Sequence, residues 1–445
     1  MSSVFQTPTP PATARGDKLP LASLIALASA TFVSVTIEML PTGLMPFMAP
    51  DLGVSEAQIG FLMTVFALCV IITSAPLTHV LRNVPRHTLL IGVLLLFCVG
   101  SLGTALAPSY PFIVVSRIVA GIAHGVLWAT IAAYASLITP KHLMAQGLSI
   151  TLSGGSTAFV LGVPLGTALG QLFGWRMTFA VLVVVALIVA GILYKLLPRV
   201  DHLAEDNFTQ PITLPEPVAT AAATSPHALA EQVGAVRARP AVHPKTMGAV
   251  ALMSAITAIT MFGHYAFYSY ISPYMTDVMG VAHEHLSLML FAYGILSAIA
   301  TLAMGLLFGS RPILGIFLNL GMALAAGAIM LTFAPTSTVA GVIGLGMWGL
   351  AMGFLPPLYQ SRILVLSPSH KRDLSSAIYS SCFNVGIGGG SFVGGILLDR
   401  AGIMTLPTTF LIFMSIAIAA ALGAWRLLAN GRQQADERAR GRAGV

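Results

Sequence analysis

An acidic residue, Glu38, occupies the middle of a segment that is otherwise suited to lipid, ATFVSVTIEMLPTGLMPFMAP at 30–50. Read as a helix, this segment gathers its polar side chains on one face, and these are Thr31, Ser34, Glu38 and Thr42. An ionisable group inside a membrane is costly, so it usually faces water or a partner and serves a function. We therefore expect Glu38 to exchange a proton and Ser34 and Thr42 to line a cavity. The alternative is a permanently protonated glutamate that only packs.

A second polar group lies in FIVVSRIVAGIAHGVLWATIAAYASL at 112–137, where a helix places Arg117, His124 and Trp128 on one face. Arg117 and Glu38 lie at similar depths in their segments, which predicts a pairing, direct or through water. In the alternative, Arg117 bonds backbone carbonyls or extends outward. Burial favours a protonated carboxyl and a guanidinium favours a carboxylate, so a conformational change that alters this balance would move a proton. His124 either shares this proton relay or is a structural residue with satisfied hydrogen bonds.

Aromatic residues are concentrated in MFGHYAFYSYISPYM at 261–275. Rings with hydroxyl tips suit planar or amphipathic ligands. The candidates for a substrate cavity are His264, Tyr265, Tyr268 and, from the earlier segment, Trp128. The outer two tyrosines, Tyr270 and Tyr274, are expected at the membrane interface instead. A later segment at 375–399 adds uncharged hydrogen-bonding groups to the cavity, Ser380 and Asn384.

Composition excludes a soluble protein. Of the 445 residues, 56% are hydrophobic and 8% are charged, and the mean hydropathy is +0.87, whereas soluble domains are roughly 25% charged. Three cysteines inside apolar segments indicate neither a disulfide framework nor a metal site. No phosphate-binding loop, zinc-protease motif or nucleophile elbow is present, so we expect neither an enzyme nor a cofactor.

Twelve segments are long enough to span a membrane, which predicts an all-α membrane protein. Six lie on each side of a polar, proline-rich gap, which predicts two pseudo-symmetric six-helix bundles. The expected domains are a disordered tail at 1–20, a first bundle at 21–198, a linker at 199–245, a second bundle at 246–428 and a tail at 429–445. The expected spans are 21–49, 56–81, 88–107, 111–138, 142–171, 176–197, 246–277, 284–309, 311–334, 337–366, 370–398 and 404–428.

The positive charges predict the orientation in the membrane. Of the 22 lysines and arginines, all but Arg117, Arg176 and Arg400 fall on the side that the linker and both tails share. By the positive-inside rule this side is cytoplasmic. The net charge of +7 is spread over short connections and tails, so it does not indicate a nucleic-acid groove.

The two halves are related by a constant offset of 228 residues, which aligns glycines and a proline. The aligned pairs are Gly121 with Gly349, Gly125 with Gly353, Pro140 with Pro368, Gly162 with Gly390 and Gly166 with Gly394. Such a repeat predicts a binding site near the middle of the bilayer, between the halves. Glu38 and Arg117 have no charged counterpart in the second half, so we expect the first half to handle the ion and the second to supply aromatic surface.

Four stretches carry a resemblance to a known family: EMLPTGLMP at 38–46, SRIVAGIAHG at 116–125, GVPLGTALGQ continuing to GWR at 162–176, and FNVGIGGG at 383–390. Together they resemble the major facilitator superfamily, and within it the bacterial drug:proton antiporter-1 group that includes arabinose and sugar efflux permeases. The resemblance implies a monomeric rocker-switch exporter in the bacterial inner membrane that exchanges protons for a small organic molecule.

The resemblance also assigns roles to single positions. Arg117 matches the arginine of the family's fourth-helix motif, with Gly121 and Gly125 as close-packing positions, and Gly162, Pro164 and Gly166 match the antiporter motif of helix five. Two departures stand out: the usual Gly-Pro pair is Gly-Val-Pro here, and the loop between helices two and three keeps only Arg86 of its motif. The gating interaction of that loop is therefore in question.

Two other functions stay open at this point. A proton-coupled uptake symporter has the same topology, and a membrane receptor without flux would not need Glu38. The expected partners are a small molecule, protons and the lipid bilayer. Sugars, purines, amino-acid metabolites and lipophilic cations are all compatible with one acid and many aromatic residues.

Overall fold

The structure, a computed structural model, describes residues 19–140, 143–199, 246–368 and 371–443. Twelve helices in these residues are long and apolar enough to cross a membrane, and the described residues contain no strand. This confirms the predicted all-α architecture, and the chain is a multi-pass membrane protein. The tail at 1–18 and the expected linker from residue 200 to 245 lie outside the described residues.

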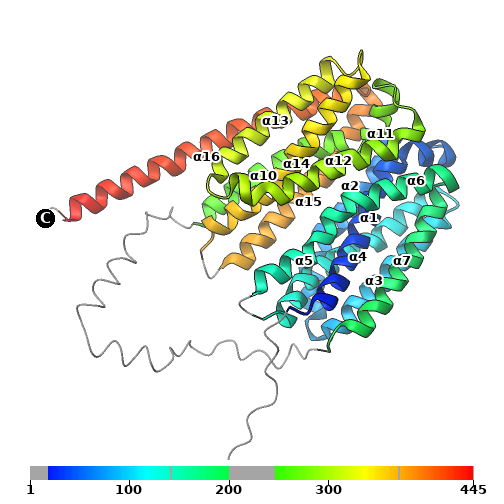
Figure 1. Cartoon of the computed structure of the whole chain (residues 1–445), viewed down its shortest axis with the longest axis horizontal. Helices are drawn as coiled ribbons and strands as arrows, with labels where there is room; N and C mark the ends of the chain where they lie inside the picture. The colour runs from blue at the N-terminus through cyan, green and yellow to red at the C-terminus, as the bar shows by residue number, and fades with distance from the viewer. Residues whose placement is uncertain (1–18, 141–142, 200–245, 369–370, 444–445) are drawn as a thin grey trace, which may run out of the picture.

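The first bundle contains six spans joined by short turns (Figure 1). Its elements are α1 (Leu21–Leu52), α2 (Glu56–Val80), η1 (Leu81–Asn83), α3 (Arg86–Ala105), α4 (Tyr110–Ile138), α5 (Met144–Thr157), the π-helical turn η3 (Ala158–Gly162), α6 (Val163–Phe173) and α7 (Trp175–Leu196). Together α5, η3 and α6 form one span with an irregular middle. Pro164 explains the irregularity, because a proline has no N–H to donate to the preceding turn and the bonding pattern widens there.

The second bundle contains the other six spans. Its elements are α10 (Met247–Tyr268), α11 (Ile271–Pro273), the π-helical turn η5 (Tyr274–Val278), the 3₁₀ turn η6 (His283–His285), α12 (Leu286–Phe308), α13 (Pro312–Thr332), α14 (Thr338–Leu366), α15 (Arg372–Ala401) and α16 (Thr405–Ala443). The last helix continues far past its span and projects from the bundle in Figure 1. The expected tail at 429–445 is therefore helical as far as Ala443.

The seventh span ends earlier than the aromatic pattern suggests. Its regular helix stops at Tyr268, and α11 and η5 continue it as short turns. Tyr270 and Tyr274 are fully buried, so the expectation that they lie at the membrane interface is wrong. Their hydroxyl groups donate to backbone carbonyls inside the bundle, Tyr270 to Ser391 at 2.7 Å and Tyr274 to Met330. These internal acceptors satisfy the hydroxyl groups without water.

Glycines at equivalent positions allow equivalent helix contacts in the two halves. A Cβ on Gly121 of α4 would lie 2.9 Å from the carbonyl oxygen of Phe66 in α2. A Cβ on Gly349 of α14 would lie 2.9 Å from the carbonyl oxygen of Tyr293 in α12. Small residues let helices approach this closely. The packing of α4 on α2 is thus repeated by α14 on α12, as the offset of 228 residues predicts.

The two bundles lie side by side and converge at one end (Figure 1). We call this the far end, where α1 leads into α2 and α15 into α16, and we call the other end, where α7 ends and α10 begins, the linker end. Near the far end the halves are joined by hydrogen bonds. Ser55 Oγ donates to Asp399 Oδ2 at 3.4 Å, and Ser272 Oγ donates to the carbonyl of Thr42 at 2.7 Å.

Toward the linker end, α5 exposes a polar face. Its exposed residues recur at helical spacing and are Gln146, Ser149, Ser153 and Thr157. The next turn, η3, contacts α12 of the second bundle, so this region of α5 borders the gap between the halves. Amide and hydroxyl groups at membrane depth need water or protein partners. Ser153 and Thr157 meet this need by donating to backbone carbonyls of α5. We call the region that this exposed face borders, at the linker end of the gap, the opening.

Candidate functional site

Glu38 is buried in the first bundle and faces a histidine. Its side chain lies in the middle of α1 with 5% of its surface exposed, and Oε2 is 3.6 Å from Nε2 of His124 on α4. The other ring nitrogen of His124, Nδ1, is hydrogen-bonded to Ser34 Oγ at 2.8 Å. The rings of Phe66 and Phe97 contact the imidazole edge-on. The result is a short polar chain from Ser34 through His124 to Glu38, enclosed by apolar groups.

Arg117 lies beside this chain but is bonded to the backbone. Its Nη1 donates to the carbonyl of Ile37 at 2.6 Å, and its guanidinium carbon lies 5.0 Å from the ring centre of Phe179. Arg117 and Glu38 are both described, and no ion pair joins them within 4 Å. The direct form of the predicted pairing is thus absent in this conformation, where Arg117 bonds a backbone carbonyl. The pairing through water stays a prediction. Nε and Nη2 of Arg117 have no hydrogen-bond partner although they are buried.

Two other residues expected in the cavity lie near this group. The indole of Trp128 is 5.9 Å from the ring centre of His124, and its N–H has no hydrogen-bond partner. The hydroxyl of Thr42 is buried without a partner, one turn of α1 beyond Glu38. Buried polar groups without partners are uncommon and need a reason. A ligand or a water molecule that binds between the halves is one such reason.

A cluster of rings in the second bundle faces the same region. The His264 ring lies 4.7 Å from the ring of Tyr265, 5.0 Å from that of Tyr268 and 5.4 Å from that of Trp348. Its Nδ1 and the indole N–H of Trp348 are buried without hydrogen-bond partners. Tyr293 of α12 adds a further ring, 5.1 Å from Tyr268. We call these five residues the ring cluster: His264, Tyr265, Tyr268, Tyr293 and Trp348.

Among the described residues, one ring-to-ring contact joins the ring cluster to the first bundle. The ring of Phe159, in the π-helical turn η3, lies 6.5 Å from that of Tyr268. The chain from Ser34 to Glu38 and the ring cluster therefore approach the gap between the halves from opposite sides. Sequence analysis missed Phe159, Tyr293 and Trp348. Trp348 could have been found from its place in the sequence. It directly precedes Gly349, where the internal repeat predicts close helix packing.

Ser380 and Asn384 lie apart from the ring cluster. Asn384 Nδ2 donates to the carbonyl of Ser380 at 2.9 Å, and both residues are incompletely buried. They share a face of α15 with Gly388, whose carbonyl accepts a hydrogen bond from Thr64 Oγ1 of α2 at 3.0 Å. This face therefore looks toward the first bundle, and Ser380 and Asn384 lie on its linker-end part. They border the opening rather than the buried group.

The residues assigned to structural motifs act through packing. A Cβ on Gly162 would overlap the side chain of Thr36, and one on Gly166 would overlap that of Leu40, so both glycines let the fifth span approach α1. A Cβ on Gly125 would lie 3.0 Å from Thr73 Oγ1 of α2. Arg86 begins α3, and its Nε has no hydrogen-bond partner. A gating role for Arg86 stays a prediction.

The site combines one ionisable carboxyl group, one guanidinium and several buried N–H and O–H groups without partners. Within the described residues, no group of three or more potential metal ligands is found. A carboxyl group that can contact either a histidine or an arginine can be neutral beside the histidine and ionised beside the arginine. Aromatic faces and free N–H and O–H groups bind molecules that have both apolar and hydroxyl surfaces.

Comparison with protein families decides the class of the chain. A model described as the Major Facilitator Superfamily matches residues 27–282 and 253–444. The chain belongs to the major facilitator superfamily. Over 384 residues it is 29% identical to the "Probable sugar efflux transporter" of Pasteurella multocida (strain Pm70), which covers 86% of this chain and 87% of that protein. The chain is therefore a transporter.

Solved structures of the superfamily share the fold. A bacterial homologue of the human lysosomal transporter Spinster, in an inward-facing and unoccupied conformation, superimposes with a TM-score of 0.71 at 16% identity, covering 93% of this chain and 98% of its own. A D-xylose–proton symporter gives a TM-score of 0.67 at 17% identity, covering 91% and 96% of the two chains. At these identities the likeness shows the superfamily fold and says nothing of the substrate.

Proposed function

We propose that this transporter exports a sugar or a related polyhydroxylated molecule in exchange for protons. It acts as a monomer in the bacterial inner membrane, with the linker and both tails in the cytoplasm. The observation that carries the proposal is the buried group of Glu38, His124 and Arg117 at the gap between two bundles. The name of the relative from Pasteurella multocida supports the substrate class and the direction.

Proton coupling rests on the two partners within reach of Glu38. A protonated, neutral Glu38 suits the position beside His124, where it is seen. Loss of the proton creates a buried carboxylate, which needs a charged or hydrogen-bonding partner. Arg117 supplies it, because Nε and Nη2 are unpartnered and its Nη1 already holds the carbonyl of Ile37, the residue before Glu38. Movement of the carboxyl between His124 and Arg117 thus accompanies uptake and release of the proton.

The shape of the molecule supports alternation between a state open at the linker end and a state open at the far end. The far end is joined by hydrogen bonds between the halves, such as Ser55 to Asp399, and the linker end exposes polar residues of α5. The distribution of lysine and arginine supports a cytoplasmic position for the linker end. We infer that this conformation admits a substrate from the cytoplasm to the gap between the halves, while the ring cluster itself is buried.

The ring cluster accounts for binding of a sugar. Aromatic faces cover the C–H surface of a sugar ring, while its hydroxyl groups need donors and acceptors. Trp348, His264 and Trp128 each present a buried polar atom without a partner. A site built from hydrogen-bonding groups rejects analogues that lack the matching hydroxyl groups. We therefore expect preference for sugars over lipophilic cations.

Flux measurements in proteoliposomes under a pH gradient test the proposal. For an antiporter, an acidic lumen drives accumulation of substrate inside the vesicle, whichever way the protein is inserted. For the alternative, an uptake symporter, an acidic exterior drives accumulation. A panel of pentoses, hexoses, disaccharides, a purine nucleoside and a lipophilic cation defines the substrate class. Absence of gradient-driven flux for the whole panel would favour a receptor without transport.

Trp348→Phe is expected to weaken substrate binding by about threefold to tenfold, because it removes one neutral hydrogen-bond donor worth about 1 kcal/mol and keeps an aromatic ring. A phenyl ring keeps the stacking on Phe267, 4.8 Å between ring centres, and a thermal unfolding curve shows whether the buried site tolerates the smaller side chain. Binding of the transported sugar by calorimetry checks this result. Tyr194→Phe removes a hydroxyl from a side chain that is 58% exposed and serves as the matched control. Equal affinities in the two variants would show that the indole N–H of Trp348 does not bind the substrate.

A further inference from the structure

Two backbone carbonyl groups in the middle of α1 have no donor within their own helix. A proline has no N–H, so the carbonyl four residues before it lacks its helical hydrogen bond. Pro41 leaves the carbonyl of Ile37 without this bond, and Pro46 does the same to the carbonyl of Thr42. Both residues are buried, and a buried carbonyl without a partner is costly. Each of the two therefore needs a donor from another part of the protein.

Side chains from both bundles supply these donors. Nη1 of Arg117, on α4 of the same bundle, donates to the carbonyl of Ile37 at 2.6 Å. Ser272 Oγ, on α11 of the other bundle, donates to the carbonyl of Thr42 at 2.7 Å. We call them the inner carbonyl, of Ile37, and the outer carbonyl, of Thr42. The inner one belongs to the residue before Glu38, and the outer one joins the two halves at the far end.

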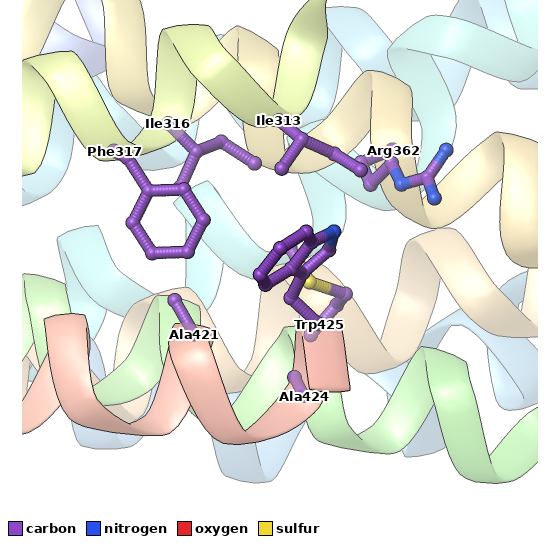
Figure 2. A pocket seen from close by; sticks show the side chains of 8 residues that line it. Ile313, Ile316, Phe317, Arg362, Ala421, Ala424 and Trp425 are labelled. Atoms are coloured by element: carbon purple, nitrogen blue, oxygen red, sulfur yellow. The ribbon is translucent and has the colours of Figure 1, made fainter. Parts of the chain in front are cut away.

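A proline in the second bundle has the same effect without joining the halves. Pro357 of α14 leaves the carbonyl of Gly353 without a helical donor, and Thr301 Oγ1 of α12 donates to it at 2.9 Å. Beyond this proline, α14 borders an apolar pocket whose lining comes entirely from the second bundle. Figure 2 shows this pocket with Arg362 of α14 and Trp425 of α16. The outer carbonyl of α1, by contrast, is bonded across the gap.

Beyond Pro41, α1 packs tightly on α6. A Cβ on Gly170 of α6 would overlap the side chain of Leu44. Such close packing ties the outer part of α1 to α6. Helix α6 itself begins after the π-helical turn η3, where Gly162 packs on Thr36 of α1. Prolines and π-helical turns are the places where helices bend. Both spans therefore have such a place at a similar depth, beyond which their outer parts can tilt together.

The charge of Glu38 decides which group Arg117 binds. Side chains lean toward the start of a helix and carbonyls point toward its end. In α1 the carboxyl group thus lies toward the linker end, where it meets His124, and the inner carbonyl points toward the far end. A carboxylate binds two N–H groups of a guanidinium side by side, which fixes the plane of all its nitrogens. Binding an ionised Glu38 therefore draws Nη1 of Arg117 away from the inner carbonyl.

Few titratable groups of the described residues face Glu38. They are Arg117 and His124 of α4 and, from the second bundle, Tyr265 of α10, on which the charge of Glu38 acts. Helices α5, α6, α11 and α12 also pack on α1 and contain no acidic residue, lysine or arginine. The charged residues of α2, α3 and α7 lie at or near helix ends, and these are Glu56, Arg86, Arg176 and Lys195.

We propose that α1 is a lever, hinged at Pro41, that links the charge of Glu38 to the contact between the halves at the far end. The inference rests on the proton coupling proposed above. When Glu38 is protonated, Arg117 binds the inner carbonyl and Ser272 binds the outer one, as seen here. When Glu38 is ionised, Arg117 turns to the carboxylate and the inner carbonyl loses its donor. The bend at Pro41 then changes, the outer carbonyl separates from Ser272, and the far end opens.

Double electron–electron resonance between two spin labels, measured over a series of pH values, tests the proposal. The labels are attached through Ser109→Cys and Thr336→Cys, exposed residues in the far-end turns of the two halves. The reference is the full-length transporter that carries both labels and lacks the native cysteines. Its ratio of long to short label distances should rise about fivefold or more from acidic to alkaline buffer, because a buried carbonyl that loses its donor changes a two-state ratio by this order. Glu38→Gln should keep the short distance throughout.

Pro41→Ala restores the N–H that the inner carbonyl lacks. The carbonyl then keeps a donor in either charge state of Glu38, so the far end should lose most of its response to pH. Alanine is favoured inside a helix, so the variant should fold. Ser272→Ala should enlarge the long-distance population at every pH, because it removes the bond to the outer carbonyl. Pro50→Ala, at an exposed proline in the last turn of α1, is the matched control and should respond as the reference does.

The results separate this inference from the proposed function. A pH response that is lost in Glu38→Gln but unchanged in Pro41→Ala overturns the lever alone. The lever is also overturned if Pro50→Ala loses the response as Pro41→Ala does, or if Ser272→Ala leaves the two populations unchanged. A response that persists in Glu38→Gln, or a reference that shows none, overturns the proposed proton coupling together with the lever.

Discussion

Glu38→Gln is expected to reduce accumulation driven by a pH gradient to the level of vesicles without protein. The amide has nearly the shape of a protonated carboxyl and keeps a hydrogen-bonding group near Nε2 of His124, but it cannot gain or lose a proton. Exchange of substrate across the vesicle membrane without a gradient should persist. Its rate should stay within about tenfold of the wild type, because one neutral hydrogen bond contributes about 1 kcal/mol.

The measurement pairs gradient-driven accumulation with counterflow of labelled substrate in the same proteoliposomes. Glu284→Gln is the matched control, because Glu284 lies at the far end with an exposed side chain, 78% accessible. A thermal unfolding curve shows whether the variant is folded. Removing a buried ionisable group should leave the melting temperature unchanged or raise it. Normal gradient-driven flux through a folded Glu38→Gln variant would rule out Glu38 as the proton carrier.

Gly294→Val is expected to shift the transporter away from the conformation described here. Gly294 of α12 lies against the first bundle, where a Cβ would be 2.8 Å from Cα of Val160 and closer still to the carbonyl oxygen of Phe159. Both contacts are with backbone, which cannot rotate away as a side chain can. Overpacking costs about 1–3 kcal/mol, and a bias of that size changes a two-state population by roughly fivefold to 150-fold.

Cysteine accessibility reports this shift on both sides of the molecule. In a background without the native cysteines, Ser153→Cys on the exposed face of α5 should react more slowly when Gly294→Val is present. Ser55→Cys, at the closed far end, should react faster. Gly191→Val is the matched control, because a Cβ at Gly191 meets nothing within 4 Å. Unchanged reactivity at both reporters in a folded variant would contradict the prediction.

The sequence predicted the membrane spans and their close helix contacts better than it predicted which polar side chains lie together. Apolar length locates a helix, and the glycines at 121 and 349 locate close contacts because only glycine fits where a backbone of another helix lies. The rotation of a helix about its axis is not contained in its own periodicity. Depth alone therefore suggested that Arg117 meets Glu38, whereas the packing of α4 directs His124 to Glu38 and Arg117 to the carbonyl of Ile37.

Residues from separate helices escaped the sequence analysis for the same reason. Tyr293 and Trp348 join His264 only because α10, α12 and α14 meet, and no spacing within one segment reports such a meeting. The tyrosines at 270 and 274 were misplaced because a terminal position in a span was taken as a surface position. The span continues there through the short turns α11 and η5, and the core covers both rings.

The division of the molecule into an acid-bearing half and a ring-bearing half has an evolutionary consequence. Under the proposed function, substitutions among the aromatic side chains of α10, α12 and α14 would change which substrate is accepted and leave the proposed proton-coupling residues of α1 and α4 unchanged. A change at either place should then combine with a change at the other in a nearly additive manner. Under the same proposal, substrate selectivity would diversify between related transporters while the proton-coupling residues stay the same.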